Sequence, residues 1–466
     1  MKSIRNLTSL VAIATLVSLT MACGSDDDSP ADDSSGSGGG AGSDGSGSGG
    51  SSGSAAPGSC DLSGDGLPRE AIPLQITDDM TLTSDTVWTL DDIAYVNDGA
   101  TLTIEPCTRI EGEKIPVGAL VISRGGRIMA EGTADEPILF TGKSEVGSRM
   151  AGDWGGLILL GRAPNFEGDN VTIEGLEEAP ENQYGGSDAG DNSGTLRYVR
   201  IEFSGFELSA DNEINGLTLG SVGSGTTIDH IMVSNTLDDG YEWFGGTVNA
   251  SHLISNNAGD DMFDMDQGYS GHLQFLFGRQ VNPISSNPNG FECDSSNDGA
   301  TPTTTPTVSN VTLCGLGSVA ANGETIGAVF RERLEGNYSN LILTGFERGI
   351  DARDEFGSAS SPNVEVTGSV FFDNFVDNIA PDETGDDDND SGFDEVAWIT
   401  DSARDNSESD PGFSCGPGGT PEPYPSSAID GVTPGSGLDT SADYAGAFED
   451  ANDDWMTGLW VDWSES

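Results

Sequence analysis

Basic residues are scarce in this 466-residue chain, which has 18 Lys and Arg against 78 Asp and Glu and a formal net charge of −60. There are 3 His, and the only lysines are Lys2, Lys114 and Lys143. A surface this acidic repels other polyanions, which excludes nucleic acid as a partner unless a cation bridges the two. The charge is typical of a solvated acidic coat, with divalent-cation binding as the alternative.

Residues that favour long helices are also sparse, because the chain is rich in Gly (66 residues), Ser, Thr, Val, Ile and Asp. No helical period of useful length separates the apolar segments. The chain lacks a P-loop, a dinucleotide-binding fingerprint, an H-E-x-x-H motif and a nucleophile elbow. The composition predicts an all-β protein, and the missing motifs make a binding or structural role a better expectation than enzymatic activity.

The N-terminus resembles a bacterial lipoprotein signal peptide over residues 1–22. A short positive region precedes an apolar stretch, Leu10 to Met21, that is too short to span a bilayer as a stable helix. Ala22 is small, as the cleavage site requires, and Cys23 would be the acylated residue. The alternative is an ordinary secretory signal followed by a chance cysteine.

Residues 23–59 consist of Cys23 and a segment made almost only of Gly, Ser, Ala and Asp, which is typical of a flexible tether. A tether after an acylated cysteine holds a domain off a membrane. Gly24 follows Cys23, which resembles outer-membrane sorting. We therefore expect an exported lipoprotein of the outer membrane, facing the periplasm or the cell surface, with the lipid membrane as a partner.

Five cysteines follow the tether: Cys60, Cys107, Cys293, Cys314 and Cys415. An exported chain meets oxidising conditions, in which cysteines form disulfides. We expect the pairs Cys60–Cys107 and Cys293–Cys314. Five cysteines cannot all pair within one chain, and the sequence alone does not determine the connectivity.

From Thr81 the chain consists of short apolar runs broken by turn residues. The runs "TIDHIMVSN" (227–235), "TVNASHLISNN" (247–257) and "GHLQFLFG" (271–278) recur at a spacing of about 20–22 residues. Such a period is typical of a parallel β-helix, in which each coil adds one layer. We predict a right-handed parallel β-helix solenoid with inserted loops over residues 60–415. A segment over residues 416–466, with Trp455 and Trp460, is expected to cap one end, and N-terminal strands the other.

Several longer motifs occur in a fixed order: "GDWGGLILLGRAP" (152–164), "YGGSDAGDNSGTLRYVRIEFSG" (184–205), "YEWFGGTVNASHLISNN" (241–257) and "DYAGAFEDANDDWMTGLW" (443–460). They resemble a family of exported right-handed β-helix lipoproteins found in Bacteroidetes and myxobacteria, over roughly residues 75–460. The resemblance implies the fold and the export. It brings no catalytic residues, because that family has no settled activity. Cys107 and Cys293 stand where the family has Gly and Ser, which suggests added disulfides.

Five short segments superpose as equivalent strands: "GYEWF" (240–244), "MFDMD" (262–266), "GFECD" (290–294), "VFRER" (329–333) and "GIDAR" (349–353). One column is apolar and is expected inside: Tyr241, Phe263, Phe291, Phe330 and Ile350. Strand alternation places two columns outside. The first contains Glu242, Asp264, Glu292, Arg331 and Asp351, and the second contains Phe244, Asp266, Asp294, Arg333 and Arg353.

Acids stacked about 5 Å apart raise one another's pKa, so such a column needs compensation. An ion-pair network through Arg331 and Arg333 is one interpretation. A ligand or cation site is another, because a row of hard oxygen ligands suits Ca²⁺. The third is a catalytic centre, in which Arg331, Arg333 or Arg353 would pair with an anionic substrate or assist proton abstraction.

Two weaker patterns also suggest metal binding. The loops "DLSGDG" (Asp61, Ser63, Asp65) and "DDNDSG" (Asp387, Asn389, Ser391) match the first half of a calcium-binding loop, but neither has Glu at its end. The histidines His230, His252 and His272 recur at similar spacing. We interpret them as a polar ladder at a strand start, because stacked coils hold imidazole rings parallel and not converging on one metal ion.

Taken together, these patterns predict a surface-anchored β-helix that acts as a binding or structural module of the cell envelope, with glycan as one candidate ligand. A calcium-dependent polysaccharide lyase or hydrolase is one alternative. An accessory subunit of an outer-membrane transporter is another. Calcium is the only cofactor that the residues suggest.

Overall fold

The computed structural model of the protein describes residues 60–209, 212–282, 284, 288–296, 298–317, 325–353, 363–381, 390, 392–416 and 418–464. The chain divides into two units, Met1–Ala55 and Ala56–Ser466, and every described residue belongs to the second. The signal peptide, Cys23, the tether and the loop with Asp387, Asn389 and Ser391 therefore lie outside the described residues. Among the described residues, no helix has both the length and the apolar character needed to cross a membrane.

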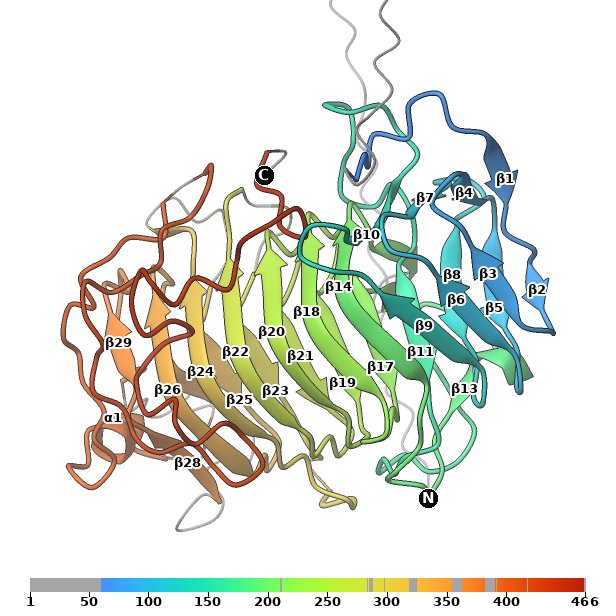
Figure 1. Ribbon diagram of the computed structural model, residues 1–466. Helices are drawn as coiled ribbons and strands as arrows, with labels where there is room; N and C mark the ends of the chain where they lie inside the picture. Colours follow the sequence, from blue (N-terminus) through green and yellow to red (C-terminus); the bar gives the residue numbers. More distant parts are fainter. Residues whose placement is uncertain are drawn as a thin grey trace, which may run out of the picture. The chain divides into compact units, whose positions relative to one another are not determined.

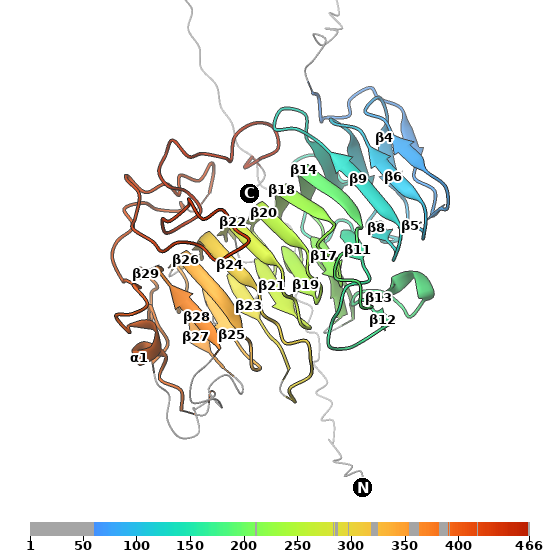
Figure 2. The ribbon, with the colours of Figure 1, turned by 60° about the horizontal axis from the view of Figure 1, so that its bottom comes forward.

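Parallel strands form two large sheets (Figures 1 and 2). Described strands of sheet A are β1 (Arg69–Ala71), β4 (Val87–Leu90), β7 (Arg109–Gly112), β10 (Ile138–Gly142), β14 (Gly194–Glu202), β18 (Thr227–Ser234), β20 (Asn249–Asn256), β22 (His272–Arg279), β24 (Thr307–Cys314), β26 (Gly336–Thr344), β28 (Val364–Thr367) and β29 (Val370–Phe372), together with β3 (Met80–Leu82), β6 (Thr101–Ile104) and β9 (Arg127–Glu131). Those of sheet B are β2 (Gln75–Ile76), β5 (Ile93–Val96), β8 (Ala119–Ile122), β11 (Leu157–Leu160), β17 (Leu217–Gly220), β19 (Tyr241–Phe244), β21 (Phe263–Asp266), β23 (Phe291–Cys293), β25 (Ala328–Phe330) and β27 (Asp351–Ala352). Two antiparallel pairs lie in insertions: β12 (Val171–Thr172) with β13 (Gln183–Tyr184), and β15 (Phe206–Ser209) with β16 (Asn212–Ile214).

The chain alternates between the two sheets, so each coil adds a layer to both. After β17 in sheet B it forms β18 in sheet A, returns to β19 in sheet B and continues to β20. Equivalent residues of successive coils pair in parallel register, as Tyr241 does with Phe263 and Phe263 with Phe291. This arrangement confirms the predicted parallel β-helix.

Sheet A bends along a line of single residues with positive φ in the middle of six successive strands: Tyr198, His230, His252, Phe275, Asn310 and Asn340. The ladder continues on both sides of this line, since Asp229 pairs with Ser251 and Ile231 with Leu253. A left-handed residue interrupts the extended backbone, so each strand turns there and sheet A presents two faces. Together with sheet B, the β-helix therefore has three faces, each made of parallel strands.

The core lies between these faces and consists of the inward columns of every coil. In sheet B one inward column is Tyr241, Phe263, Phe291 and Ala328, and the other is Trp243, Met265, Cys293 and Phe330. The expected place of Phe330 beside Phe291 is therefore wrong by two residues. The coil of β25 exchanges the positions of its large and small side chains, which keeps the core filled.

The expected C-terminal cap also differs from the structure. Trp398 and Ile399 of helix α1 (Glu395–Ile399) belong to the main core cluster, with Phe393 packed against it. Helix α1 lies near β28 and β29 in Figure 1. Trp455 and Trp460 instead belong to a segment, residues 418–464, that lies along the outer face of sheet A and is called the strap below.

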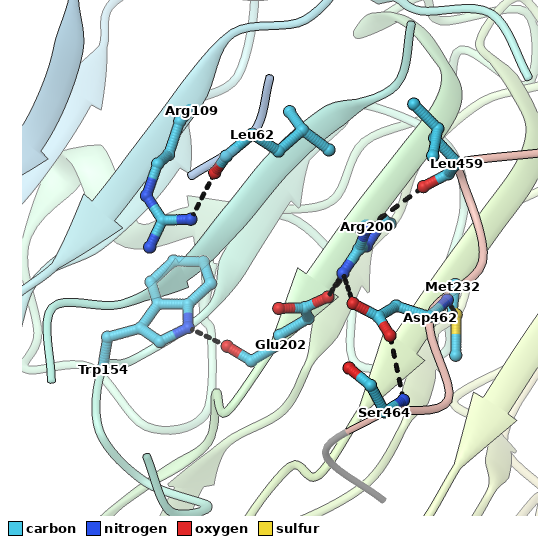
Figure 3. A network of polar contacts seen from close by, with 9 residues as sticks. All are labelled: Leu62, Arg109, Trp154, Arg200, Glu202, Met232, Leu459, Asp462 and Ser464. Atoms are coloured by element: carbon cyan, nitrogen blue, oxygen red, sulfur yellow. Dashed lines mark hydrogen bonds and ion pairs between the residues drawn. The ribbon is translucent and has the colours of Figure 1, made fainter. Parts of the chain in front are cut away.

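Hydrogen bonds fix the strap along successive strands of sheet A. The Nδ2 atom of Asn340 donates to the carbonyl oxygen of Val432 (2.8 Å), and that of Asn310 donates to the carbonyl oxygen of Tyr444 (2.8 Å). At the far end of the strap, Arg200 donates to the carbonyl oxygen of Leu459 (3.1 Å) and to Asp462 (2.7 Å). Figure 3 shows the two contacts of Arg200, and it shows Arg109 donating to the carbonyl oxygen of Leu62 near the N-terminal end of the described chain.

An outward column of sheet A explains why the strap lies there. Its members are Met232, Ile254, Phe277, Thr312, Ile342 and Val370. The apolar ones pack against Ala445, Ala447, Phe448, Met456 and Trp460 of the strap. Because this column would expose a large apolar surface, the strap contributes a second core outside the coils.

Replacement of Ile254 by Val tests whether the strap covers this apolar column. Ile254 is 0% exposed, so we expect loss of one buried methylene to lower the free energy of unfolding by about 0.5–1.5 kcal/mol in denaturant titrations. Val146→Ala is the control, since Val146 is 72% exposed and should change stability by less than about 0.5 kcal/mol. Equal effects of the two substitutions would contradict the packing of the strap over this apolar column.

Two disulfides join described cysteines. Cys60 pairs with Cys107 (Cα–Cα 5.5 Å), as expected. The expected pair Cys293–Cys314 is wrong, because Cys314 pairs with Cys415 (Cα–Cα 6.0 Å) and Cys293 is buried and free. Cys293 points into the core from sheet B, whereas Cys314 ends a strand of sheet A beside the chain that leads into the strap.

Candidate cation-binding site

The outer face of sheet B changes character along its length. At β8 and β11 it is apolar and packs against the insertion that contains β12 and β13. From β19 onward one outward column contains Glu242, Asp264 and Glu292, followed by Val329 and Asp351. The structure therefore places these predicted acids on one face, with Asp266 and Asp294 in the neighbouring column.

Arg331 and Arg333 lie elsewhere than expected. Because Phe330 pairs with Cys293, Arg331 follows β25 beside Asp294 and not in the column of Glu292. Arg331 Nε donates to Asp294 Oδ1 (2.7 Å), and its Nη2 atom also bonds Glu292. Glu332 and Arg333 have positive φ (54° and 64°) and lie in the turn after β25, outside both columns.

Arg353 keeps its expected column but is also bonded to a carboxylate. Its Nη2 atom donates to Asp351 Oδ2 (2.7 Å). Asp351 is almost completely buried, and its Oδ2 atom also accepts a hydrogen bond from Arg348 Nη1 (3.4 Å). At this end of sheet B the charges therefore form the ion-pair network that was one of the three interpretations.

The centre of the acidic face is different, because carboxylates gather there with few bases. The turns before β19 and β21 add two pairs of acids that the predicted columns omitted: Asp238 with Asp239, and Asp260 with Asp261. Asp239 Oδ1 accepts a hydrogen bond from the backbone N–H of Asp261 (2.8 Å). Carboxylate oxygens of Asp239, Asp261 and Asp264 lie within 4.8 Å of one another. The repeated Asp-Asp phrase at a spacing of 22 was the sequence signal for this cluster.

Burial and mutual repulsion oppose ionisation throughout this cluster. Burial, with Glu242 and Glu292 nearby, raises the pKa of Asp264 well above its usual range. Burial likewise raises the pKa of Asp239 and of Asp261, and like charges add to the effect. Burial raises the pKa of Asp266 to about 7, and that of Glu292 to about 7 although Arg331 opposes this shift.

These residues fit a hard divalent cation. The Oδ1 atoms of Asp261, Asp264 and Asp266 are buried, and none of the described residues donates a hydrogen bond to them. An unpaired buried carboxylate oxygen is costly, and a coordinated cation removes that cost. Carboxylates without nitrogen or sulfur ligands suit Ca²⁺ better than a transition metal.

The histidines form a different structure. His230 and His252 are equivalent, but the residue equivalent to them in the next coil is Phe275, so His272 lies outside the column. The rings of His230 and His252 stack with centroids 4.2 Å apart and an angle of 18°. Both Nδ1 atoms lie 2.9 Å from Asp229 Oδ1. These three residues are close enough to hold an ion, but His272 is not one of them, so the three histidines do not form a single metal site.

The described N-terminal loop has the hydrogen bonds of a turn. Asp61 Oδ1 accepts from the backbone N–H of Ser63 (3.0 Å), and Ser63 Oγ accepts from that of Asp65 (3.1 Å). Neither aspartate belongs to the carboxylate or histidine groups close enough to hold an ion within the described residues. The structure thus offers no support for calcium in this loop.

The chain is similar to a known protein family and to solved structures. A family model described as a pectate-lyase-like β-helix domain matches residues 74–412. No curated protein matches the chain. The solved structure of pectate lyase Pel9A is similar over 76% of this chain and 89% of its own, with 14% identity and a TM-score of 0.33. Tailspike protein 2 of the Escherichia coli O157:H7 bacteriophage CAB120 is similar over 62% of this chain and 38% of its own, with 13% identity and a TM-score of 0.25.

Proposed function

The chain belongs to the family described as the pectate-lyase-like β-helix domain, and from this premise we propose that it is a module that binds an acidic glycan through a divalent cation on the outer face of sheet B. The observation that carries the proposal is the cluster of Asp239, Asp261 and Asp264, whose oxygens converge without enough donors. Bound Ca²⁺ would supply positive charge and free coordination positions there.

Charge explains why a cation and an acidic glycan belong together. The whole chain carries 78 acids against 18 bases, so a carboxylate-bearing polysaccharide is repelled in the absence of a cation. Asp239, Asp261 and Asp264 would hold the ion. The ion would then attract the sugar carboxylate to a face that otherwise excludes it.

Binding is favoured over cleavage because the candidate arginines are engaged. Arg331 is bonded to Asp294 and Glu292, and Arg353 is bonded to Asp351. A guanidinium held by carboxylates on its own sheet is a poor candidate for pairing with a substrate or assisting proton abstraction. These arginines therefore serve the ion-pair network.

A calcium-dependent lyase or hydrolase is the second candidate, and one observation favours it. Burial raises the pKa of Asp266 and that of Glu292 to about 7. A general base works best with a pKa near the working pH. Both carboxylates lie on the same face as the cation cluster, so either would be placed to accept a proton from a bound sugar.

The site is proposed to act at a membrane. Acylation of Cys23 would anchor the protein in the outer membrane, and residues 24–59 would tether the β-helix to it. Such an anchor suits a protein that retains glycan at the envelope. It equally suits an accessory subunit of a transporter, which copurification of envelope proteins with the full chain would reveal.

Glycan binding is tested with a polyuronate and a neutral glucan of similar length. With Ca²⁺ present we expect the polyuronate alone to bind, and a chelator should weaken its Kd at least about tenfold. Asp264→Asn should have the effect of the chelator, whereas Asp169→Asn, at an exposed position of the insertion, should leave Kd unchanged. Binding of equal strength with and without chelator would contradict the proposal.

The same samples separate binding from cleavage. A binding module leaves the polyuronate intact on prolonged incubation. Release of unsaturated or reducing ends that Asp266→Asn or Glu292→Gln abolishes, while circular dichroism shows an intact fold, would replace the binding module by the lyase or hydrolase.

A further inference from the structure

The three most exposed large hydrophobic side chains among the described residues lie in two neighbouring loops. Ile115 is 85% exposed, Val146 72% and Met150 68%. Residues 113–118 connect β7 to β8, and residues 143–156 connect β10 to β11. Because β7 and β10 pair in parallel register at their last residues, both loops begin at the same corner of the β-helix, on consecutive coils. These two loops are called the corner patch below.

Basic side chains lie among these apolar ones, although the chain has few bases. Both lysines of the described chain, Lys114 and Lys143, belong to the corner patch. In each of three ion pairs the base is more exposed than its acid, so the positive charge faces solvent. The exposed fractions of the side chains are 50% and 3% for Arg69 with Glu111, 56% and 7% for Lys114 with Asp153, and 40% and 32% for Lys143 with Glu113.

Acidic residues limit the reach of these bases. Asp91 and Asp92 form the same corner one coil earlier, and Glu145 is an exposed acid of the second loop. At physiological ionic strength an exposed charge acts over about 8 Å, so the bases attract an anionic group only when it touches the patch. A broad surface with many anionic groups and an apolar layer beneath them fits this combination of short-range charge and exposed apolar side chains.

The start of the described chain lies beside the corner patch. Leu62 and Ser63 line a hollow of about 240 Å³ together with Val146 and Arg149 of the second loop. Figure 3 shows Leu62 next to Arg109 of β7, the strand that leads into the first loop. The segment that precedes residue 60 therefore joins the β-helix at this corner.

We propose that the corner patch docks on the surface of a phospholipid bilayer. Ile115, Val146 and Met150 enter the headgroup region, and Lys114 and Lys143 contact lipid phosphates, because apolar burial and attraction to anionic lipids add in interfacial binding. A flexible coil of the length of residues 24–59 spans about 30–36 Å, so an acylated Cys23 would keep the patch within reach of the bilayer. That last step rests on the proposed anchor, whereas the affinity of the patch for lipid does not.

Cosedimentation with vesicles tests the docking in the absence of an anchor. The protein is the chain 23–466 with Cys23→Ser, which cannot be acylated and keeps every described residue. At physiological ionic strength we expect it to bind vesicles that contain phosphatidylglycerol. Binding to vesicles of phosphatidylcholine alone, or in 1 M NaCl, should be at least about tenfold weaker.

Two triple variants locate the contact. Replacement of Ile115, Val146 and Met150 by Ser should reduce the partition coefficient at least about tenfold, because the apolar area that enters the lipid is lost. The control replaces exposed apolar residues at the other end of the stack by Ser and should bind as the parent chain does. Its positions are Phe375 and Val376 after β29, and Val396 in α1, which are 40%, 51% and 41% exposed. Thermal midpoints report the folding of both variants.

Absence of binding to anionic vesicles would overturn the proposal, and so would an equal effect of the two triple variants. Capture of an envelope protein through the patch, without vesicle binding, would replace the bilayer by a protein partner. Vesicle binding without polyuronate binding would reject the proposed function alone, and polyuronate binding without vesicle binding would reject the docking alone.

Discussion

Calcium added to the metal-free protein near neutral pH is expected to raise the free energy of unfolding by about 4 kcal/mol once the free ion exceeds its Kd about a thousandfold. Only the folded coils bring Asp239, Asp261 and Asp264 together, so the ion binds the folded state and not the unfolded chain. The measurement is urea unfolding with Ca²⁺ and with chelator.

Other acids of the same face give the metal-free protein a pH dependence of known sign. In the fold, burial raises the pKa of Asp266 and that of Glu292 to about 7, and that of Asp238 to about 8. Their unfolded values are about 4. Between these values the folded state binds more protons than the unfolded chain, so these three acids make stability fall as pH rises from about 4 to about 8.

Calcium should reduce this slope, because a cation bound by Asp239, Asp261 and Asp264 favours the charged forms of the acids around it. Unfolding midpoints across the acid to mildly alkaline range, with and without Ca²⁺, check both effects in one series. A metal-free protein whose stability rises over this range, or a calcium effect absent near neutral pH, would contradict the assignment of these acids.

Loss of the Cys314–Cys415 disulfide is expected to cost about 4–5 kcal/mol, because the bond closes a loop with a sequence separation of 101 residues. The double variant Cys314→Ser, Cys415→Ser avoids a lone thiol. It should also loosen the strap, which Trp455 and Trp460 would report by a shift of their emission to longer wavelength as they become solvated.

A matched control is the pair Cys60→Ser, Cys107→Ser, with a sequence separation of 47 residues. It should lose about 4 kcal/mol by the same entropy argument, but the tryptophan emission of its folded state should not change, because neither Cys60 nor Cys107 belongs to the apolar cluster that contains Trp455 and Trp460. An unchanged stability of the strap variant, or the same emission shift in both, would contradict the proposed role of the Cys314–Cys415 bond.

The fold was predictable because its signal is repeated. The 22-residue spacing between Tyr241 and Phe263 reappears in backbone pairing, and strand alternation placed Glu242 and Asp264 on the outer face correctly. Each coil repeats the same pattern, so local errors do not change the architecture. The disulfide Cys60–Cys107 was also expected, since each cysteine lies near the start of the predicted body.

The predicted alignment of the strands is wrong in the coil where the sequence repeat is weakest. In the coil of β25 the small Ala328 stands where the two preceding coils have Phe, and Phe330 stands where they have Cys or Met. An alignment by hydrophobicity therefore slipped by two residues and moved Arg331 into the wrong column. A slip of two keeps the inward and outward faces unchanged, and the warning in the sequence was Glu332, an acid that this alignment places in the inward column of Trp243, Met265 and Cys293.

Long-range packing of irregular chain had no sequence signal of this kind. The strap has no period, and its partners lie up to about 260 residues away, as in the pair Arg200 and Asp462 with a separation of 262. The disulfide from Cys314 to Cys415 depends on that packing. The Asp-Asp turns were visible as a repeat, but only their placement beside Asp264 in three dimensions distinguishes a site from a repeated bend of the chain.

The strap changes how a solenoid of this kind folds and unfolds. In a simple solenoid each coil touches only its neighbours, so coils can detach one by one from an end. Here one continuous segment is held by Asn340 and Asn310 on two adjacent coils and by Arg200 on β14, with β18, β20 and β22 in between. Loss of a terminal coil therefore disturbs contacts on distant ones, which makes unfolding cooperative across the whole stack. These long-range contacts also place the chain among slow-folding topologies, because the last residues must be present before the first coils gain their outer cover.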